Sequence, residues 1–296
     1  MTTTIEDAAR ILRSGGVVAF PTETVYGLGA NALDPQAVRR IYEQKGRPAT
    51  SPLIVHVSSI EMARSLSSAW PTAAEELALR YWPGPLSIVV PKIAAVPDEV
   101  TSGLPTVGLR IPRHPVALQL LALAGVPVAA PSANKFTEVS PTTAQHVRDT
   151  FGDAVPVVDG GPCDVGIEST VVAVSATGKI QLLRPGMLQI PEAVIAEIES
   201  KSLSPGLHPK HYSPKRTRVM VGTAAVPGSI YVWHTQQLDN IASLQLPKEP
   251  SAYAAKLYAV LHDLDAQGYT AIVFEPLPED PAWDALRDRL HRASVA

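Results

Sequence analysis

Residues 34–57, DPQAVRRIYEQKGRPATSPLIVHV, combine a helix, a tight turn and a buried strand in one short stretch. Asp34 is suited to cap the helix, Pro35 to form its first turn and Gly46 to end it. The apolar segment PLIVHV has the composition of a buried strand. A helix followed at once by such a strand is typical of an α/β domain.

The same alternation covers the first two-thirds of the chain. Further strands are predicted within VVAF, LSIVV, VGLRI, VPVAA, VPVVD, STVVAV and KIQLL, and helices at about 73–82, 115–124, 142–151 and 191–200. Residues 201–217, KSLSPGLHPKHYSPKRT, are rich in proline and basic residues without an apolar period, which is typical of a linker. Because strand and helix patterns resume after it, we expect one α/β domain at 1–200 and a smaller one at 218–296.

Composition limits the kind of protein this can be. The 296 residues are 46% apolar, enough for a large core, and the net charge of −3 argues against a general nucleic-acid surface. The one cysteine, Cys163, allows neither a disulfide framework nor a cysteine-based zinc site within the chain. The amino terminus does not have the pattern of a signal peptide, and no segment is suited to span a membrane. We therefore expect a soluble cytoplasmic protein with no membrane partner.

Two cations, Lys45 and Arg47, flank Gly46 directly before the strand PLIVHV. They can be a solvated helix C-terminus, where positive side chains interact well with the helix dipole. They can also be an anion-binding site at the edge of the sheet. The stretch by itself leaves both interpretations open.

Arg110 lies within the apolar strand VGLRI. A buried guanidinium is costly unless it meets an anion, so its partner is either a structural carboxylate or the carboxylate of a substrate. His56, in LIVHV, raises the same question, and a hydrogen-bonded core histidine is the usual answer.

Small polar residues and a further cation mark the ends of other strands. Ser132 and Asn134 follow a strand in AAPSANKF, Ser169 opens STVVAV, and Arg184 follows the strand in KIQLLRPG. Ligands of open α/β sheets bind at strand ends. Together with the three cations above, these residues predict a pocket for a polyanion and a small carboxylate.

Two other motifs are weaker. YGLGANA has the glycine spacing of a dinucleotide fingerprint, but the strand before it ends too early and no acidic residue closes the next strand. These glycines more simply allow a turn where the backbone passes close to another group. His208 and His211 stand three apart on a proline-broken segment, which favours solvated or capping roles over metal binding.

Seven segments, in chain order, resemble the motifs of the YrdC-like threonylcarbamoyl-AMP synthases: FPTETVYGLGANA, KGRPATSPLIVHV, WPGPLSIVV, VGLRIPRHP, APSAN, GIESTVV and LLRPG. The linker SPGLHPKHYSPK and the trailing small domain resemble the two-domain branch of that family. The resemblance implies a YrdC-like, twisted open mixed sheet flanked by helices at 1–200. It also implies a linker with a lid function at 201–217 and a Rossmann-like α/β domain at 218–296.

The resemblance implies a nucleotidyltransferase that converts L-threonine, bicarbonate and ATP into threonylcarbamoyl-AMP and diphosphate. This is the first step of N6-threonylcarbamoyladenosine formation at adenosine 37 of tRNA. Magnesium would enter with ATP, held by the phosphates and by no protein ligand. A downstream threonylcarbamoyl transferase complex would use the product, and binding of tRNA itself would be weak.

The resemblance also implies roles for particular residues. The family's K-x-R and S-x-N tetrad falls on Lys45, Arg47, Ser132 and Asn134. Its ATP contacts match Arg47, Ser51, Thr106, Ser132, Ser140, Arg184 and Tyr212, and its threonine contacts match Thr24, His56, Arg110, Ala130 and Ser169. The cations around Gly46 would then serve the triphosphate, Arg110 would clamp the threonine carboxylate, and Tyr212 would close over the nucleotide to exclude water.

Two functions of other classes remain open. An RNA-binding module would use Lys45, Arg47 and Arg184. It leaves the buried Arg110 and His56 without a purpose, and only 5% of residues are aromatic. A nicotinamide-dependent oxidoreductase would rest on GLGANA alone. Binding of tRNA at two salt concentrations tests the first, and quenching of cofactor fluorescence tests the second.

Overall fold

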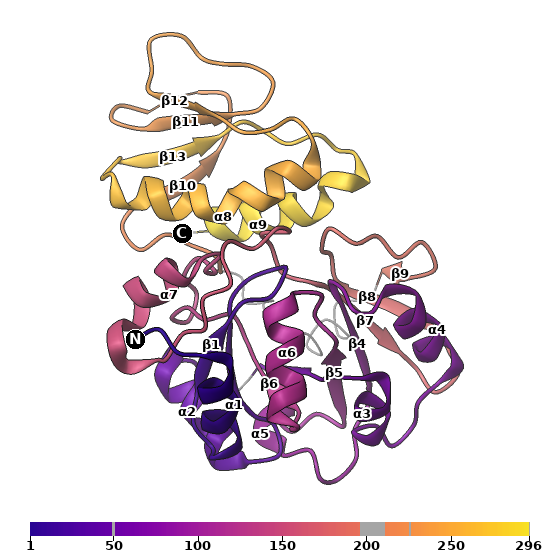
Figure 1. Cartoon of the computed structure of the whole chain (residues 1–296). Helices are drawn as coiled ribbons and strands as arrows, with labels where there is room; N and C mark the ends of the chain where they lie inside the picture. The colour runs from indigo at the N-terminus through magenta and orange to yellow at the C-terminus, as the bar shows by residue number, and fades with distance from the viewer. Residues whose placement is uncertain (49–50, 196–210, 225, 296) are drawn as a thin grey trace.

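The structure, a computed structural model, describes residues 1–48, 51–195, 211–224 and 226–295. These residues form two α/β bodies, each built on its own sheet and stacked one above the other in Figure 1. The strands of the upper sheet all come from residues after Thr217.

Nine strands of the described chain form the first sheet, in the order β1-β2-β6-β3-β5-β4-β7-β8-β9. They are β1 (Val18–Phe20), β2 (Gly27–Asn31), β3 (Ile54–His56), β4 (Leu86–Pro91), β5 (Thr106–Arg110), β6 (Val128–Ala129), β7 (Thr170–Val174), β8 (Ile180–Arg184) and β9 (Val194–Ile195). The pairs β3–β5, β4–β7 and β8–β9 are parallel, and the remaining neighbours are antiparallel. The open mixed sheet expected from the sequence is confirmed.

Helices cover both faces of this sheet. On one face, α1 (Ile5–Arg13) and α6 (Pro115–Ala124) pack together over β1 and β6. The opposite face is covered by α2 (Pro35–Lys45), α3 (Ile60–Ser65), α4 (Thr72–Tyr81), α5 (Asp98–Thr101) and α7 (Ala144–Phe151), and α7 is followed by the 3-10 turn η1 (Gly152–Ala154). The local signals for α2 are confirmed, because Asp34 caps its amino end and Gly46 ends it with a φ of 61°.

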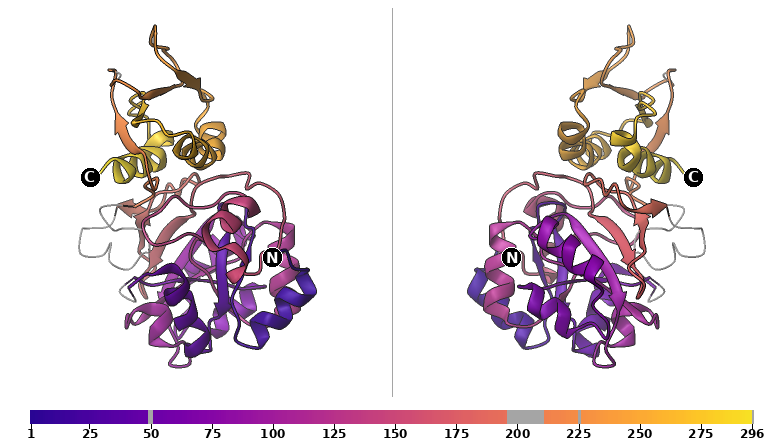
Figure 2. Two further views of the ribbon diagram at one scale, coloured as in Figure 1. Left: turned by 90° about the vertical axis from the view of Figure 1, so that its left-hand side faces the viewer. Right: turned by 90° about the vertical axis from the view of Figure 1, so that its right-hand side faces the viewer.

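The second sheet is parallel, in the order β10-β13-β11-β12. Its elements are β10 (Arg218–Val221), β11 (Ile230–Trp233), β12 (Ser243–Gln245), α8 (Pro250–Ala266), β13 (Ala271–Phe274), the 3-10 turn η3 (Pro281–Trp283) and α9 (Asp284–Ser294). This agrees with the expected small Rossmann-like body. Helices α8 and α9 lie between the second sheet and the first body, as Figures 1 and 2 show.

The two bodies share a continuous apolar core at their junction. Val25, Val139 and Ile167 of the first body belong to the same buried cluster as Tyr258 of α8 and Leu290 of α9. Because burial of apolar surface stabilises any interface in proportion to its area, this cluster holds the second body against the first. The functional pocket described below lies beside it.

Some sequence predictions are wrong in detail. YGLGANA is not a turn: Gly27–Asn31 form β2, between β1 and β6. A Cβ atom at Gly29 would lie 2.7 Å from the Phe20 ring and 2.8 Å from Val128, so glycine is needed for close strand packing. The VPVVD segment makes isolated bridges at Val157 rather than a strand.

The predicted helix at 191–200 is also wrong in its described part, where Val194–Ile195 pair with β8 as β9. Residues 196–200 of that prediction, and residues 201–210 of the predicted linker, lie outside the described residues. Within the described ranges, no helix is both long and apolar enough to cross a lipid bilayer.

Candidate active site

A pocket with an empty volume of about 590 Å³, counting its open mouth, lies over one face of the first sheet. The pocket lies on the same face of the sheet as α1 and α6. Its wall residue Ala130 belongs to the apolar cluster of those two helices, and so does Phe20, whose ring meets the wall residue His56 edge-on. Its wall is formed by Thr22, Thr24, Val25, Gly27, Arg47, Leu53, Ile54, His56, Arg110, Ala130, Pro131, Ser132, Glu168, Ser169, Arg184, His211 and Tyr212. Nine of the predicted site residues are in this wall, namely Thr24, Arg47, His56, Arg110, Ala130, Ser132, Ser169, Arg184 and Tyr212.

At one end of the pocket, His56 and Arg110 lie side by side at the ends of parallel strands β3 and β5. The Arg110 guanidinium forms an ion pair with Glu23, with 2.8 Å between Nη2 and Oε1, and its Nε donates to the Gly84 carbonyl at 3.2 Å. The side chains of His56, Arg110 and Glu23 are all buried. Arg110 therefore has a structural carboxylate as one partner, and its position in the wall also leaves contact with a substrate carboxylate as a prediction.

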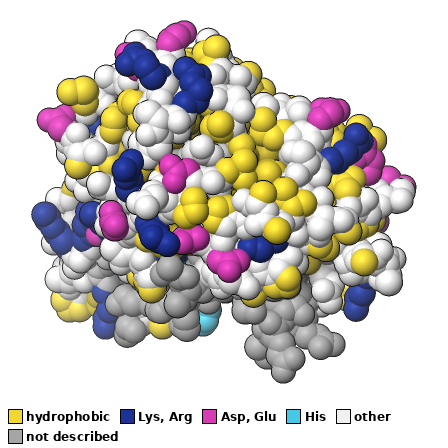
Figure 3. All heavy atoms as spheres, turned by 90° about the horizontal axis from the view of Figure 1, so that it is seen from below, with side chains coloured by type: hydrophobic (Ala, Val, Ile, Leu, Met, Phe, Trp, Pro, Cys, Tyr) yellow, Lys and Arg dark blue, Asp and Glu magenta, His cyan; other side chains and the backbone are white. Residues whose placement is uncertain are grey.

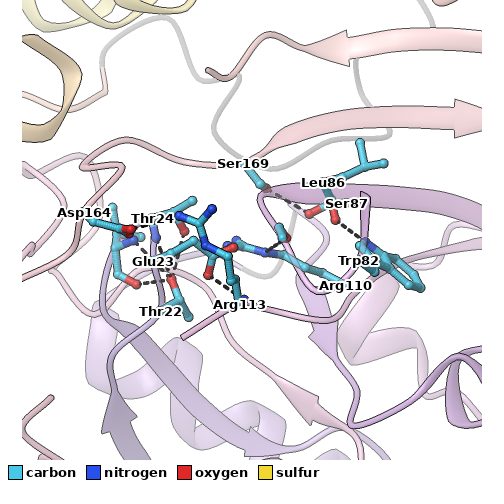
Figure 4. A network of polar contacts seen from close by, with 12 residues as sticks. Thr22, Glu23, Thr24, Trp82, Leu86, Ser87, Arg110, Arg113, Asp164 and Ser169 are labelled. Carbon is cyan, nitrogen blue, oxygen red and sulfur yellow. Dashed lines mark hydrogen bonds and ion pairs between the residues drawn. The ribbon is translucent and has the colours of Figure 1, made fainter. Parts of the chain in front are cut away.

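Glu23 itself was missed by the sequence analysis, although it lies within the quoted motif FPTETVYGLGANA. Its other oxygen accepts a hydrogen bond from the Arg113 backbone N–H at 3.1 Å. Figure 4 shows Glu23 between Thr22 and Thr24, facing Arg110, while Arg113 pairs with Asp164 nearer the surface. Since a lone buried carboxylate is expensive, Glu23 and Arg110 have to be considered as one unit.

The hydroxyl groups at this end are arranged by short-range contacts. The Thr22 and Thr24 hydroxyl oxygens lie 2.9 Å apart, and Thr22 Oγ1 donates to the Val25 carbonyl at 2.6 Å. Ser169 Oγ lies 2.9 Å from Ser87 Oγ across β4 and β7. Burial, and then the charge of Arg110, lowers the pKa of His56 to about 3, so its imidazole is neutral at physiological pH.

The other end of the pocket holds two further buried arginines, Arg47 and Arg184. Arg184 donates from Nε and Nη2 to the Ser169 carbonyl at 3.2 and 3.0 Å, and Arg47 donates to the Ser51 carbonyl at 3.3 Å. Arg47 Nε is buried without a hydrogen-bond partner among the described residues. Burial lowers the pKa of both guanidinium groups.

Lys45 is not among the residues of the pocket wall, and its expected contact with a triphosphate stays a prediction. Its Nζ donates to the Ser132 and Asn134 carbonyls, each at 2.6 Å, and lies 3.5 Å from Asn134 Oδ1. Asn134 in turn donates to the Lys135 and Glu138 carbonyls. Lys45 and Asn134 therefore hold the turn that presents Ser132.

Three other predicted residues stand behind the wall or away from it. Ser140 Oγ donates to Glu168 at 2.6 Å, and Ser51 receives the Arg47 contact through its carbonyl. Thr106 lies at the start of β5, opposite Pro91 of β4 and at the far end of the strand from Arg110. Since alternate strand residues point to one face, Thr106 still shares the face of Arg110.

Glu168 is the second carboxylate that the sequence analysis missed. It is buried, accepts from Ser140 at 2.6 Å and from Tyr258 of α8 at 2.9 Å, and pairs with Arg289 of α9 at 2.9 Å. Burial alone would raise the pKa of Glu168, but the charges of Arg289 and Arg184 and the hydrogen bonds from Ser140 and Arg289 hold it at about 2. An ionised carboxylate thus stands in the wall beside Arg184.

Tyr212 and His211 complete the wall from the segment that enters the second body. The Tyr212 ring is buried, stacks on Tyr258 at a centroid distance of 5.7 Å and lies 5.2 Å from the Arg289 guanidinium. Its hydroxyl has no hydrogen-bond partner among the described residues, and burial raises its pKa to about 12. His211 is buried as well, so the expected solvated role for it is wrong.

No group of three or more histidine, cysteine, aspartate or glutamate side chains within the described ranges could hold a metal ion. Glu168, the carboxylate in the wall at the end that holds Arg47 and Arg184, has both oxygens bonded to protein donors. The pocket is therefore suited to receive anionic groups, with cations at both ends and small hydroxyl groups between them.

Two family models cover the chain almost completely. One, the Sua5, YciO and YrdC family described as "Telomere recombination", matches residues 10–186. The other, described as the C-terminal domain of threonylcarbamoyl-AMP synthase, matches residues 185–295.

Known proteins match over the same length. The chain is 39% identical to a threonylcarbamoyl-AMP synthase of Pyrococcus abyssi, covering 98% of this chain and 94% of the relative. It is also 39% identical to one of Bacillus subtilis, with 98% and 92% covered. A crystal structure of P. abyssi Sua5 complexed with L-threonine superposes with a TM-score of 0.90 at 38% identity, covering 98% of this chain and 94% of that one.

Proposed function

The chain belongs to the two-domain threonylcarbamoyl-AMP synthases, and from this premise we propose how its pocket carries out that reaction. The enzyme forms threonylcarbamoyl-AMP from L-threonine, bicarbonate and ATP, the first step of threonylcarbamoyladenosine formation in tRNA. We assign the chemical step to adenylyl transfer, which makes the enzyme a nucleotidyltransferase.

One observation carries the assignment of the two substrates. The pocket has Arg110 at one end and Arg47 with Arg184 at the other, all buried in its wall. A buried arginine favours a planar oxyanion partner, because two parallel N–H groups match a carboxylate or phosphate. We place the threonine carboxylate at Arg110 and the ATP phosphates at Arg47 and Arg184.

The threonine end supplies the remaining contacts of an amino acid. Neutral His56 and the hydroxyl groups of Thr24 and Ser169 offer hydrogen bonds without charge, which is what an uncharged amine and a threonine hydroxyl need. Ala130 leaves room beside them. The similarity to a protein crystallised with L-threonine supports this placement.

The reaction follows from that arrangement. The uncharged threonine amine becomes a carbamate, either by adding to carbon dioxide with loss of one proton or by reacting with bicarbonate with loss of one water molecule. One carbamate oxygen then attacks the α-phosphorus of ATP. The bond from that phosphorus to the bridging oxygen breaks, and diphosphate leaves with the electron pair. Negative charge grows on the phosphoryl oxygens and the leaving group, so Arg47, Arg184 and Ser132, already in place, stabilise the transition state more than the ground state.

Magnesium enters this scheme as a part of the substrate MgATP. Bound there, magnesium would neutralise charge on the departing diphosphate.

Water has to be kept from both the carbamate and the mixed anhydride. Tyr212 stands in the wall with a buried ring, and it belongs to the segment joining the two bodies. We propose that this ring covers the nucleotide. The product then passes to a separate threonylcarbamoyl transferase that acts on tRNA.

A weak role for tRNA binding by this protein is consistent with its surface. Figure 3 shows the face of the first body turned away from the second, where Lys and Arg side chains alternate with Asp and Glu. A nucleic-acid surface would need a basic excess.

The decisive experiment measures diphosphate release from MgATP and bicarbonate, with and without L-threonine. Wild type should release diphosphate only with threonine, and Arg47→Ala should lower the rate by about 100-fold, since one preorganised charge is lost. Arg39→Ala, which removes an exposed arginine of α2 paired with Glu99, is the matched control and should keep full activity. Release that does not depend on threonine in folded wild type would rule out the proposed reaction.

A further inference from the structure

The wall that we assign to ATP contains an ionised carboxylate, which by itself would repel a triphosphate. We propose that Arg289, from α9 of the second body, is a positioning residue for the ATP half of the pocket: it pairs with Glu168 and so offsets the negative charge that this carboxylate brings to the wall. This inference rests on the proposed function only in that the ligand of this half is ATP.

Arg289 is buried and bonds to residues of both bodies. Its Nε pairs with Glu168 Oε2 at 2.9 Å, and its Nη2 donates to the Pro185 carbonyl at 3.1 Å, directly after Arg184 in the chain. Its Nη1 pairs with Asp288 at 2.7 Å. With its side chain fully buried, every bond it forms is to protein. Arg289 is therefore held in place from both bodies at once.

Charge balance explains why Arg289 matters to the pocket. Glu168 interacts with two cations, Arg289 and Arg184, and each of these charges lowers the pKa of the carboxyl group. If Arg289 were removed, the carboxylate would keep only Arg184 as its large compensating charge. The wall would then carry a carboxylate without its ion-pair partner, and the phosphates would meet a pocket one positive charge poorer.

Arg289 also contacts the ring of Tyr212, which we propose covers the nucleotide. The Arg289 guanidinium lies 5.2 Å from the Tyr212 ring centroid, and Tyr258, which stacks on Tyr212, donates to Glu168 at 2.9 Å. Cation–π contacts of this kind are strongest when desolvated, as here. The second body thus acts on the nucleotide side through one connected set of groups, and Arg289 itself contacts none of the residues that we assign to threonine.

The test is equilibrium binding of MgATP by calorimetry, in the full-length protein and without turnover. Arg289→Met should weaken MgATP binding by about tenfold or more, as expected when one member of a buried charge pair is truncated. Threonine binding, measured separately, should change by less than about twofold, because Arg289 has no direct contact with the residues that we assign to threonine. Arg287→Met is the matched control, since Arg287 is on the same helix but bonds outward to Asp284 and the Pro278 carbonyl.

A double variant separates charge balance from simple damage. Arg289→Met/Glu168→Gln removes both charges, leaves no unpaired ion, and should recover MgATP binding to within about threefold of wild type. It also provides the test if Arg289→Met alone fails to fold. A double variant as weak as the single one, or a Glu168→Gln variant that has lost ATP binding by itself, would overturn the inference.

The pH dependence gives a further readout that a structural role would not move. In Arg289→Met, burial would raise the pKa of Glu168, so lowering the pH from about 8 to 6 should improve its MgATP affinity relative to wild type. A constant ratio between the two proteins would contradict the proposal. Because these measurements need no threonine, they stay valid even if the proposed reaction fails its own test.

Discussion

Two buried ion pairs flank the pocket, and they differ in where their partners come from. Glu23 and Arg110, 2.8 Å apart, both belong to the first body and sit between β3, β5 and the loop before β2. Glu168 and Arg289, 2.9 Å apart, join the first body to α9 of the second. The half of the pocket that we assign to threonine therefore has its ion pair within one body, and the half that we assign to ATP has an ion pair that joins both bodies.

We infer from this difference that the second body supports the ATP half of the pocket without contacting the reacting atoms. Tyr258, Arg289 and the apolar cluster around Leu290 all meet the first body beside Glu168. A perturbation of the junction should therefore weaken ATP binding and leave threonine binding intact, whereas a perturbation of Glu23 or Arg110 should do the reverse.

The largest effect is expected from Arg110→Met. Breaking a buried pair by removing one partner costs about 3–5 kcal/mol, because Glu23 is left as an uncompensated charge. Thermal unfolding should show this loss, and threonine binding should vanish. MgATP binding in the fraction that remains folded should persist.

The double variant Glu23→Gln/Arg110→Met sharpens the comparison with the other pair. It should regain most of the stability but no threonine binding, because Arg110 contacts the ligand whereas Arg289 acts through Glu168. Arg113→Met is the matched control, since it removes an exposed arginine three residues on that pairs with Asp164. Recovery of threonine binding in the double variant would remove Arg110 from the binding site.

A smaller effect is expected from acid, and it should act on the junction. His262 of α8 stacks on His146 of α7 at 4.0 Å, its Nε2 lies 3.2 Å from the Ser140 carbonyl, and Lys215 and Asp265 are the nearby charges. Burial, and then the charge of His146, lowers the pKa of His262 to about 4. The unfolded chain binds this proton near pH 6.5, so stability present above that pH is lost as the pH falls toward 4.

The expected loss from His262 is about 2 kcal/mol between pH 8 and pH 5, because the unfolded state gains the proton first. His262→Gln should abolish this part of the acid sensitivity in thermal unfolding and in MgATP binding. His291→Gln, which changes an exposed histidine of α9, should leave the pH profile as it is. An unchanged profile for His262→Gln would place the acid-sensitive group elsewhere.

The parts of the fold that local chemistry determines could be predicted from the sequence. Helix α2 follows from Asp34, Pro35 and Gly46, whose capping and turn preferences act within a few residues. β2 could not be predicted in the same way, because its glycines are required by Phe20 and Val128 on neighbouring strands. The spacing of these glycines instead resembles that of a turn.

The site shows the same limit. A buried arginine in a strand predicts that an anion is near, but which carboxylate it meets depends on the topology that brings Glu23 to β5. Lys45 was placed at the correct turn, yet the direction of its ammonium depends on carbonyls 87 and 89 residues away. Glu168 had no local signal at all, since its partners Tyr258 and Arg289 are 90 and 121 residues away.

The smallest of these effects is expected where α8 holds the segment that carries Tyr212. The Asp265 carboxylate accepts three backbone N–H groups, from Lys215, Arg216 and Thr217, at 2.9, 2.9 and 2.8 Å. Asp265→Ala should cost only about 1–2 kcal/mol, because the site is half-exposed and water can replace the carboxylate. The freed segment would hold Tyr212 less firmly, so MgATP affinity should fall by about threefold and threonine affinity should not change. Asp263→Ala, an exposed carboxylate on the same helix, controls for the lost charge. If threonine binding weakened as much as ATP binding, the two halves of the pocket would not be separable, and the contrast between the two ion pairs would fail.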